Sequence, residues 1–293
     1  MSEDALRTYR GNCHCGAFVY EFKWPEIKAY NECNCSICQK LAFAWLIPGQ
    51  RDLHIVKGSI NDLKAYTFST GSFTYRFCPD CGITVLAELP PKHFGDRTAI
   101  NARTIQKLDM WSLDVSQFDG KARPPSYEPP VYKGPEPSVE VENGKTYHGS
   151  CHCGAVTVAV RLKPLDTWDI SIREERIVEC NCSICARAGY IWAYPRKENS
   201  VIQGREDLTY RVFNTGILRK GFCKHCGVHI FNEPNPLTEQ DVNNLSEDKK
   251  AFHDRIVRTR AINLRILNDF DCKTLKTTHA DGWNEFKPEY VNP

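Results

Sequence analysis

The sequence predicts a mainly β protein with two tandem domains, each built from small antiparallel sheets. Three observations support this prediction. Fourteen of the fifteen cysteines fall into two matching sets of seven, one in each half of the chain. Short runs in both halves alternate apolar and polar residues, which is typical of strands with one buried face. A proline-rich segment separates the halves, and 293 residues suit two domains of ordinary size.

The two halves also share sequence between and around the cysteines. Four stretches of the first half return in the second: GNCHCGAFVYEF (11–22) as GSCHCGAVTVAV (149–160), CNCSIC (33–38) at 180–185, FCPDCG (77–82) as FCKHCG (222–227), and AINAR (99–103) as AINLR (261–265). This repetition indicates an internal duplication, and we refer to the halves as the first and second copies.

Composition and spacing predict the domain boundaries. We expect a first domain at 1–120, a linker at 121–142 and a second domain at 143–293. Six prolines between Asp119 and Ser138 oppose both helices and sheet interiors. The second copy carries an insert at 234–258, which we expect to be helical because Thr238 and Ser246 are suitable N-cap residues.

Strand patterns lead directly into the cysteines. In the first copy, Tyr66 and Phe68 alternate with polar residues before STGS (69–72), and Tyr75 and Phe77 continue the alternation after it. This pattern predicts a hairpin with glycine in its turn. The second arm of the hairpin ends at Cys78.

Charge and composition narrow the possible partners and the compartment. A formal net charge of +2 favours neither nucleic acid nor an anionic membrane. The N-terminal MSEDALRTYRGN has no apolar core typical of a signal peptide, and no apolar run approaches the ~18 residues of a membrane span. We therefore expect a cytoplasmic protein whose cysteines are metal ligands rather than disulfides.

Four cysteines of each set are expected to close a structural zinc site. The FCxxCG stretch can aim two thiolates at one ion, and the distant C-x-C at a strand end can supply two more. The predicted sites are Cys13, Cys15, Cys78 and Cys81 in the first copy, and Cys151, Cys153, Cys223 and Cys226 in the second.

The remaining triplets predict a different kind of site. Three thiolates with an open fourth position are the layout of a reactive zinc site, and a soft thiolate is the ligand that such an ion favours. A thiol-bearing substrate is therefore expected. Two alternatives stay open: an iron–sulfur cluster, or closure by a histidine or a carboxylate from elsewhere. The triplets are Cys33, Cys35, Cys38 and Cys180, Cys182, Cys185, and the available histidines are His14, His54, His93, His152 and His229.

The order G-x-C-x-C-G-A, C-x-C-S-x-C, F-C-x-x-C-G and I-N-x-R, present twice, resembles the glutathione-dependent formaldehyde-activating enzyme family, which includes centromere protein V. The resemblance implies an Mss4-like fold of small β-sheets for each copy. It also implies a four-cysteine structural zinc and a three-cysteine catalytic zinc. The implied activity is carbon–sulfur lyase chemistry, with glutathione as co-substrate and an aldehyde or thioether as its partner.

The chain departs from the family pattern in two ways. Family members with that activity usually have one domain, whereas this chain has two complete cysteine sets. The family often has a small, glycine-rich sequence after the third cysteine of the triplet. The second copy has Gly189 there, whereas the first copy reads QKLAFAW and departs from this pattern. The equivalence of the two sites and the identity of the aldehyde therefore stay open. The alternative functions are a non-catalytic zinc-stapled binding module and a zinc-storage or redox-sensing protein.

Overall fold

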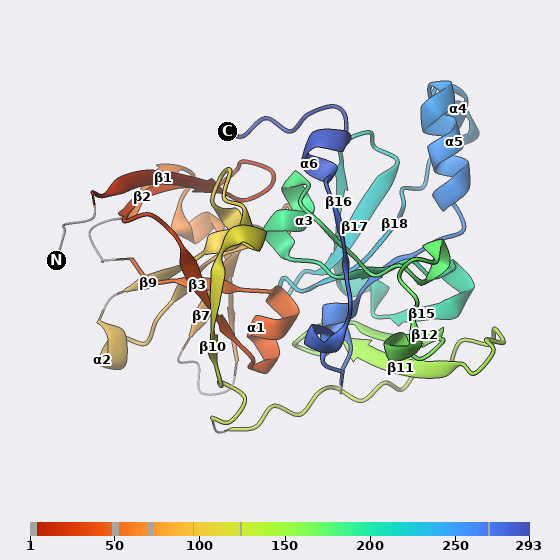
Figure 1. The fold of residues 1–293 in the computed structure, drawn as a ribbon, viewed down its shortest axis with the longest axis horizontal. Helices are drawn as coiled ribbons and strands as arrows, with labels where there is room; N and C mark the ends of the chain where they lie inside the picture. The colour runs from red at the N-terminus through yellow and green to blue at the C-terminus, as the bar shows by residue number, and fades with distance from the viewer. Residues whose placement is uncertain (1–4, 49–52, 69–72, 96, 124, 269) are drawn as a thin grey trace. The chain divides into compact units, whose positions relative to one another are not determined.

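The computed structural model describes residues 5–48, 53–68, 73–95, 97–123, 125–268 and 270–293. The chain divides into two compact units. Unit 1 comprises residues 1–128, 183–189 and 291–293, and unit 2 comprises 129–182 and 190–290. Each unit is mainly β, as predicted, and contains two sheets (Figure 1). The predicted hairpin turn at 69–72 lies outside the described residues.

The described strands of unit 1 form a three-stranded sheet, β1-β2-β5, and a seven-stranded sheet, β10-β3-β4-β9-β8-β7-β6. Their bounds are β1 Arg7–Asn12, β2 Val19–Trp24, β3 Ala29–Cys33, β4 Ala44–Leu46, β5 Leu53–Lys57, β6 Lys64–Thr67, β7 Thr74–Phe77, β8 Thr84–Glu88, β9 Thr98–Asn101 and β10 Asp114–Phe118. The helices of this unit are α1 Ser36–Leu41, α2 Pro91–Phe94 and α3 Ser183–Ala188.

Unit 2 repeats the plan with a three-stranded sheet, β11-β12-β15, and a seven-stranded sheet, β16-β17-β18-β19-β14-β13-β20. Its strands are β11 Lys145–Ser150, β12 Thr157–Leu162, β13 Val178–Cys180, β14 Trp192–Ala193, β15 Ser200–Gln203, β16 Leu208–Phe213, β17 Leu218–Cys223, β18 His229–Pro234, β19 Ala261–Asn263 and β20 Thr278–Ala280. Its helices are α4 Glu239–Asn243, α5 Glu247–Ile256 and α6 Gly282–Glu285.

The strand order shows the duplication directly. Read from its other edge, the larger sheet of unit 1 runs β6-β7-β8-β9-β4-β3-β10, which matches the larger sheet of unit 2 strand for strand. Within the described residues, the strand pairs are antiparallel except at one edge of each large sheet. There β10 runs parallel to β3, and β20 runs parallel to β13.

Buried aliphatic and aromatic side chains explain why these segments form strands. In β12, Val158 and Val160 are fully buried, and in β18 so are Ile230 and Phe231. The predicted hairpin of the first copy is β6–β7, in which Tyr66 lies opposite Tyr75. Branched and aromatic residues favour such pleated, half-buried surfaces.

The strand that leads into each CxxC turn is irregular. The register shifts between Arg76 and Phe77 in the first copy, and between Gly221 and Phe222 in the second. A bulge bends the strand and redirects the residues that follow. The first cysteine of each turn follows directly.

The second-copy insert contains α4 and α5, both drawn in blue in Figure 1. Thr238 caps α4 through a reciprocal pair of hydrogen bonds with Asp241, as the sequence predicted. Ser246 occupies the N-cap position of α5, but its side chain makes no capping hydrogen bond. None of the helices in the described part of the chain is long and apolar enough to cross a membrane.

Candidate metal centres

The first four-cysteine group joins two distant turns of unit 1. Cys13 and Cys15 follow β1, whereas Cys78 and Cys81 lie between β7 and β8. The Sγ atoms of the four residues all lie within 4.8 Å of one another. Cys15 Sγ is 3.6 Å from Cys13 Sγ and 3.5 Å from Cys78 Sγ. The structure therefore brings together the set that the spacing predicted.

Backbone amides support the sulfur atoms of this group. The N–H of Phe18 donates to Cys13 Sγ at 3.4 Å. The CxxC turn is closed by Gly82, whose N–H donates to the Cys78 carbonyl and whose φ is +70°. Glycine adopts this left-handed conformation without steric cost.

Unit 2 contains the equivalent group of Cys151, Cys153, Cys223 and Cys226, with Sγ atoms also within 4.8 Å of one another. Cys153 Sγ lies 3.5 Å from Cys151 Sγ and 3.6 Å from Cys223 Sγ. Amide donors recur here, since the N–H of Val156 donates to Cys151 Sγ at 3.2 Å.

These separations fit a single tetrahedral ion. With metal–sulfur bonds of about 2.3 Å, as for zinc, tetrahedral geometry places sulfur atoms about 3.8 Å apart. The separations of 3.5–3.6 Å in both groups are close to that value. Four sulfur donors around one point leave no open position, so both groups are suited to a structural ion.

The triplets are assembled locally, at the end of one strand and the start of a helix. In the first copy, Cys33 ends β3, Cys35 is the N-cap residue of α1, and Cys38 lies inside α1. Their Sγ atoms lie within 4.8 Å of one another, and the N–H of Cys35 donates to Cys33 Sγ at 3.4 Å.

The second copy repeats this arrangement. Cys180 ends β13, and Cys182 and Cys185 follow, with all three Sγ atoms within 4.8 Å of one another. The N–H of Cys182 donates to Cys180 Sγ at 3.3 Å. Cys180 is partly exposed, whereas Cys182 and Cys185 are buried.

The three thiols of the first-copy triplet change one another's pKa values. Hydrogen bonds with Cys35 and then Cys38 lower the pKa of the Cys33 thiol to about 3. Burial raises the pKa of the Cys38 thiol well above its usual range. The group therefore contains a thiolate, the form of cysteine that binds metal ions, at neutral pH.

Two segments of the chain, residues 8–120 and 146–246, match the family model described as glutathione-dependent formaldehyde-activating enzyme. Together they cover well over half of the 293 residues. The chain belongs to this family. A solved structure of a Rhodobacter sphaeroides protein is also similar, with 22% sequence identity over 36% of this chain and 99% of that chain, and a TM-score of 0.32. The family match confirms both the resemblance and the tandem arrangement predicted from the motifs.

Each copy of the repeated sequence thus contains one group of four cysteines and one group of three. Among the described residues, the groups of clustered metal-ligating side chains consist of cysteine alone. The five histidines considered as a fourth ligand do not join either triplet, so three sulfur atoms are the donor set that each domain provides.

Two further side chains reach the first-copy triplet, and sequence reasoning did not assign either to the site. The Tyr75 hydroxyl lies 3.3 Å from Cys38 Sγ, and the indole N–H of Trp45 donates to the same sulfur at 3.4 Å. Phe43 packs against both, with ring centroids 4.5 Å from Trp45 and 5.7 Å from Tyr75, and Trp45 and Tyr75 also contact each other at 6.0 Å. Tyr75 is 37 residues from Cys38 in sequence, so no local spacing marks it as part of this site.

The corresponding position in the second copy is Lys220, three residues before Cys223. Its side chain is 1% exposed. The ammonium lies over the rings of Tyr190 and Trp192, at 4.6 and 4.5 Å from their centroids, which is typical of a cation–π contact. At equivalent positions of their larger sheets, the first copy therefore has a neutral hydroxyl and the second copy has a cation.

Proposed function

We propose that the chain is an enzyme with carbon–sulfur lyase chemistry, which forms and cleaves the adduct between a thiol and an aldehyde. Glutathione is the proposed thiol. The triplets Cys33, Cys35, Cys38 and Cys180, Cys182, Cys185 are the proposed reactive zinc sites, and the two four-cysteine groups hold structural zinc. Family membership and the closely spaced sulfur triplets, each with three donors, support this proposal.

The reaction is balanced without a further reactant. The thiol sulfur bonds to the aldehyde carbon, the carbon–oxygen double bond becomes single, and the thiol proton is transferred to the oxygen. The reverse reaction breaks the carbon–sulfur bond and regenerates the thiol and the aldehyde. The protein must therefore bind a sulfur anion, hold it near the carbonyl carbon and supply a proton to oxygen.

When bound to the triplet, zinc supplies a Lewis acid that lowers the pKa of an incoming thiol. The N–H of Cys35 and the indole of Trp45 donate to the triplet sulfurs and disperse their negative charge. Tyr75 holds a hydroxyl beside Cys38, and we propose that it donates a hydrogen bond to the substrate oxygen as charge develops there.

We also propose that the protein works in a reducing compartment, because the triplets function only when their cysteines are reduced. The proposal also includes functional differences between the domains. The second domain has the cation of Lys220 where the first has the hydroxyl of Tyr75. The preferred aldehyde is therefore expected to differ between the two sites.

Exchange NMR tests the proposal. Glutathione and formaldehyde form their adduct spontaneously, so the measured quantity is the extra exchange rate that the protein causes, repeated with larger aldehydes. We expect the wild type to accelerate exchange and the double variant C35S/C182S to lose about 100-fold or more of that acceleration, since each substitution removes a metal ligand. Tyr75→Phe should reduce the first site's contribution by about tenfold.

The matched control is Cys272→Ser, because Cys272 belongs to none of the metal-ligand groups of the described residues. C272S should exchange at the wild-type rate. Acceleration that persists in C35S/C182S would place the chemistry elsewhere. Failure of the wild type to accelerate any aldehyde would favour the zinc-stapled binding module.

A further inference from the structure

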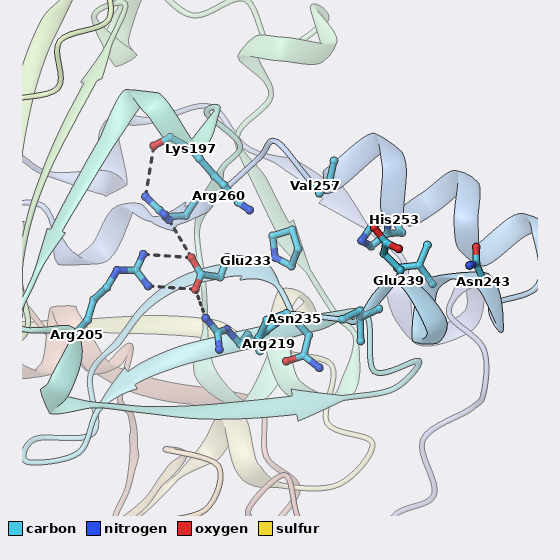
Figure 2. Close-up of a pocket in the computed structure, with 14 residues that line it drawn as sticks. Lys197, Arg205, Arg219, Glu233, Asn235, Glu239, Asn243, His253, Val257 and Arg260 are labelled. Atoms are coloured by element: carbon cyan, nitrogen blue, oxygen red, sulfur yellow. Dashed lines mark hydrogen bonds and ion pairs between the residues drawn. The ribbon is translucent and has the colours of Figure 1, made fainter.

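A second candidate site lies in unit 2. A pocket of about 840 Å³ is bounded by β17 and β18 on one side and by the α4–α5 insert on the other (Figure 2). Its volume is within the range of small-molecule sites. Its charged lining comprises Lys197, Arg205, Arg219, Arg260, Glu233 and Glu239.

One buried carboxylate binds three of the four cations. Arg205 makes two contacts with Glu233 at 3.2 and 3.3 Å, Arg219 donates at 2.8 Å, and Arg260 donates at 3.1 Å. Figure 2 shows these three guanidinium groups converging on the carboxylate. The Glu233 side chain is 5% exposed. A single negative charge leaves this cluster strongly positive.

The fourth cation of the lining is Lys197. In the described part of the chain, no carboxylate lies within ion-pair distance of the Lys197 ammonium. Burial lowers the pKa of that ammonium, and the charges of Arg260, Arg205 and Arg219 lower it further, against the opposing effect of Glu233. Lys197 therefore lies close enough to this cluster to sense the charges of its three arginines as well as that of Glu233.

Among the described residues that line the pocket, one buried hydrogen-bond donor also lacks an acceptor. Within the described residues, Nε of Arg219 is buried and has no acceptor. The guanidinium packs over the Tyr210 ring at 4.0 Å, which fixes its orientation. Oriented guanidinium and ammonium groups in a partly desolvated pocket are suited to carboxylate or phosphate oxygens.

The fold itself does not require the arginines that surround Glu233. Glu88 of the first copy is equivalent to Glu233, since each lies seven residues after the last cysteine of its CxxC turn. The cross-strand neighbours of Glu88 are Thr74 and Thr98, whereas Arg219 and Arg260 occupy the equivalent positions beside Glu233. The first copy forms the same sheet with threonines there.

We propose that this pocket binds a small doubly charged oxyanion, either a phosphate monoester or a dicarboxylate, at Lys197, Arg219 and Arg260. The insert closes the other side of the pocket with His253 and Val257 (Figure 2). The site belongs to the second copy alone and requires nothing of the cysteine triplets.

Calorimetry and thermal unfolding at constant ionic strength test this proposal, with inorganic phosphate, glycerol phosphate and succinate as probes and chloride as the reference. We expect the full-length protein to bind at least one probe saturably. Comparing the affinities for the two phosphates and for succinate then shows whether the ligand is a phosphate monoester or a dicarboxylate. Ligand-linked stabilisation should follow the calorimetric affinity.

Two substitutions test whether the anion binds in this pocket. Lys197→Gln should weaken affinity about five- to tenfold and Arg219→Thr about tenfold or more, because each removes a charged donor. Arg196→Gln is the matched control, since Arg196 is the adjacent cation, is 70% exposed and does not line the pocket. It should change affinity less than twofold.

Two results would overturn the proposal. One is that all three probes act no differently from chloride. The other is that Lys197→Gln and Arg196→Gln weaken binding equally, which would indicate general charge attraction. Lys197→Gln keeps the test valid if Arg219→Thr fails to fold, because Lys197 makes no ion pair in the described part of the chain.

Discussion

Ala42 and Gly189 end equivalent helices with the same left-handed backbone, at φ values of 50° and 60°. Both follow the third cysteine of a triplet by four residues. A side chain with Cβ in this conformation costs roughly 1–2 kcal/mol, which glycine avoids at some cost in unfolded-chain entropy. The glycine noted in the second copy therefore relieves backbone strain that the first copy retains.

This pair predicts opposite effects of exchanging the two residues. Ala42→Gly should raise the free energy of unfolding by about 0.5–1 kcal/mol. Gly189→Ala should lower it by at least about 1–2 kcal/mol, because the added Cβ is strained at this φ and would also lie less than 3 Å from neighbouring side-chain atoms. Urea denaturation of the zinc-loaded protein measures both. The same sign for both substitutions would contradict the account.

At the scale of elements, β18 carries Glu233 into a cluster of arginines. Burial on its own raises the pKa of this carboxyl. Hydrogen bonds from Arg205 and Arg219, with the charge of Arg260, outweigh burial and lower the pKa to about 2. A carboxyl with a lowered pKa stabilises the fold above its ordinary pKa of 4.5, and this contribution disappears as the pH falls through about 2.

Glu233→Gln should therefore lower the free energy of unfolding by roughly 3 kcal/mol at pH 7. The difference from the wild type should shrink steadily between pH 4.5 and pH 2, because the wild-type carboxyl becomes protonated. Denaturation curves at several pH values check this. Glu239→Gln on the rim of the same pocket is the control and should cost less than about 0.5 kcal/mol at every pH. A difference that is independent of pH would contradict the ion-pair explanation.

Sequence patterns predicted the features that are specified by residues close together in the chain or by the duplication. The β6–β7 hairpin follows from alternation, the cap of α4 follows from Thr238, and both sets of clustered cysteines follow from spacing and duplication. The parallel edge pairs were not predicted, because β10 pairs with a strand about 80 residues earlier and nothing local specifies that partner.

The same reasoning missed the groups that only tertiary structure brings together. Tyr75 looked like an ordinary apolar strand residue, and its hydroxyl reaches Cys38 only after β7 has paired within the sheet. The arginines around Glu233 come from separate elements, so no sequence motif marks them. The insert at 234–258 was expected to be helical, and it contains the two helices α4 and α5.

At the scale of the whole molecule, the duplicated domains keep the same sheets and the same seven-cysteine plan but differ around them. The first has a hydroxyl beside its triplet, and the second has a buried cation at the equivalent position, together with an insert and a basic pocket. Such differences agree with the proposal that the second copy binds a separate ligand on the shared scaffold.

Zinc content per chain tests the central claim most directly. The account predicts about four ions in the wild type, about three in either Cys35→Ser or Cys182→Ser, and about two in the double variant, because the closed four-sulfur sites are unaffected. Added glutathione should alter the spectrum of a cobalt-substituted wild type and leave the double variant unchanged. Two ions in the wild type, unchanged in all variants and indifferent to glutathione, would contradict the claim that the triplets are reactive metal sites.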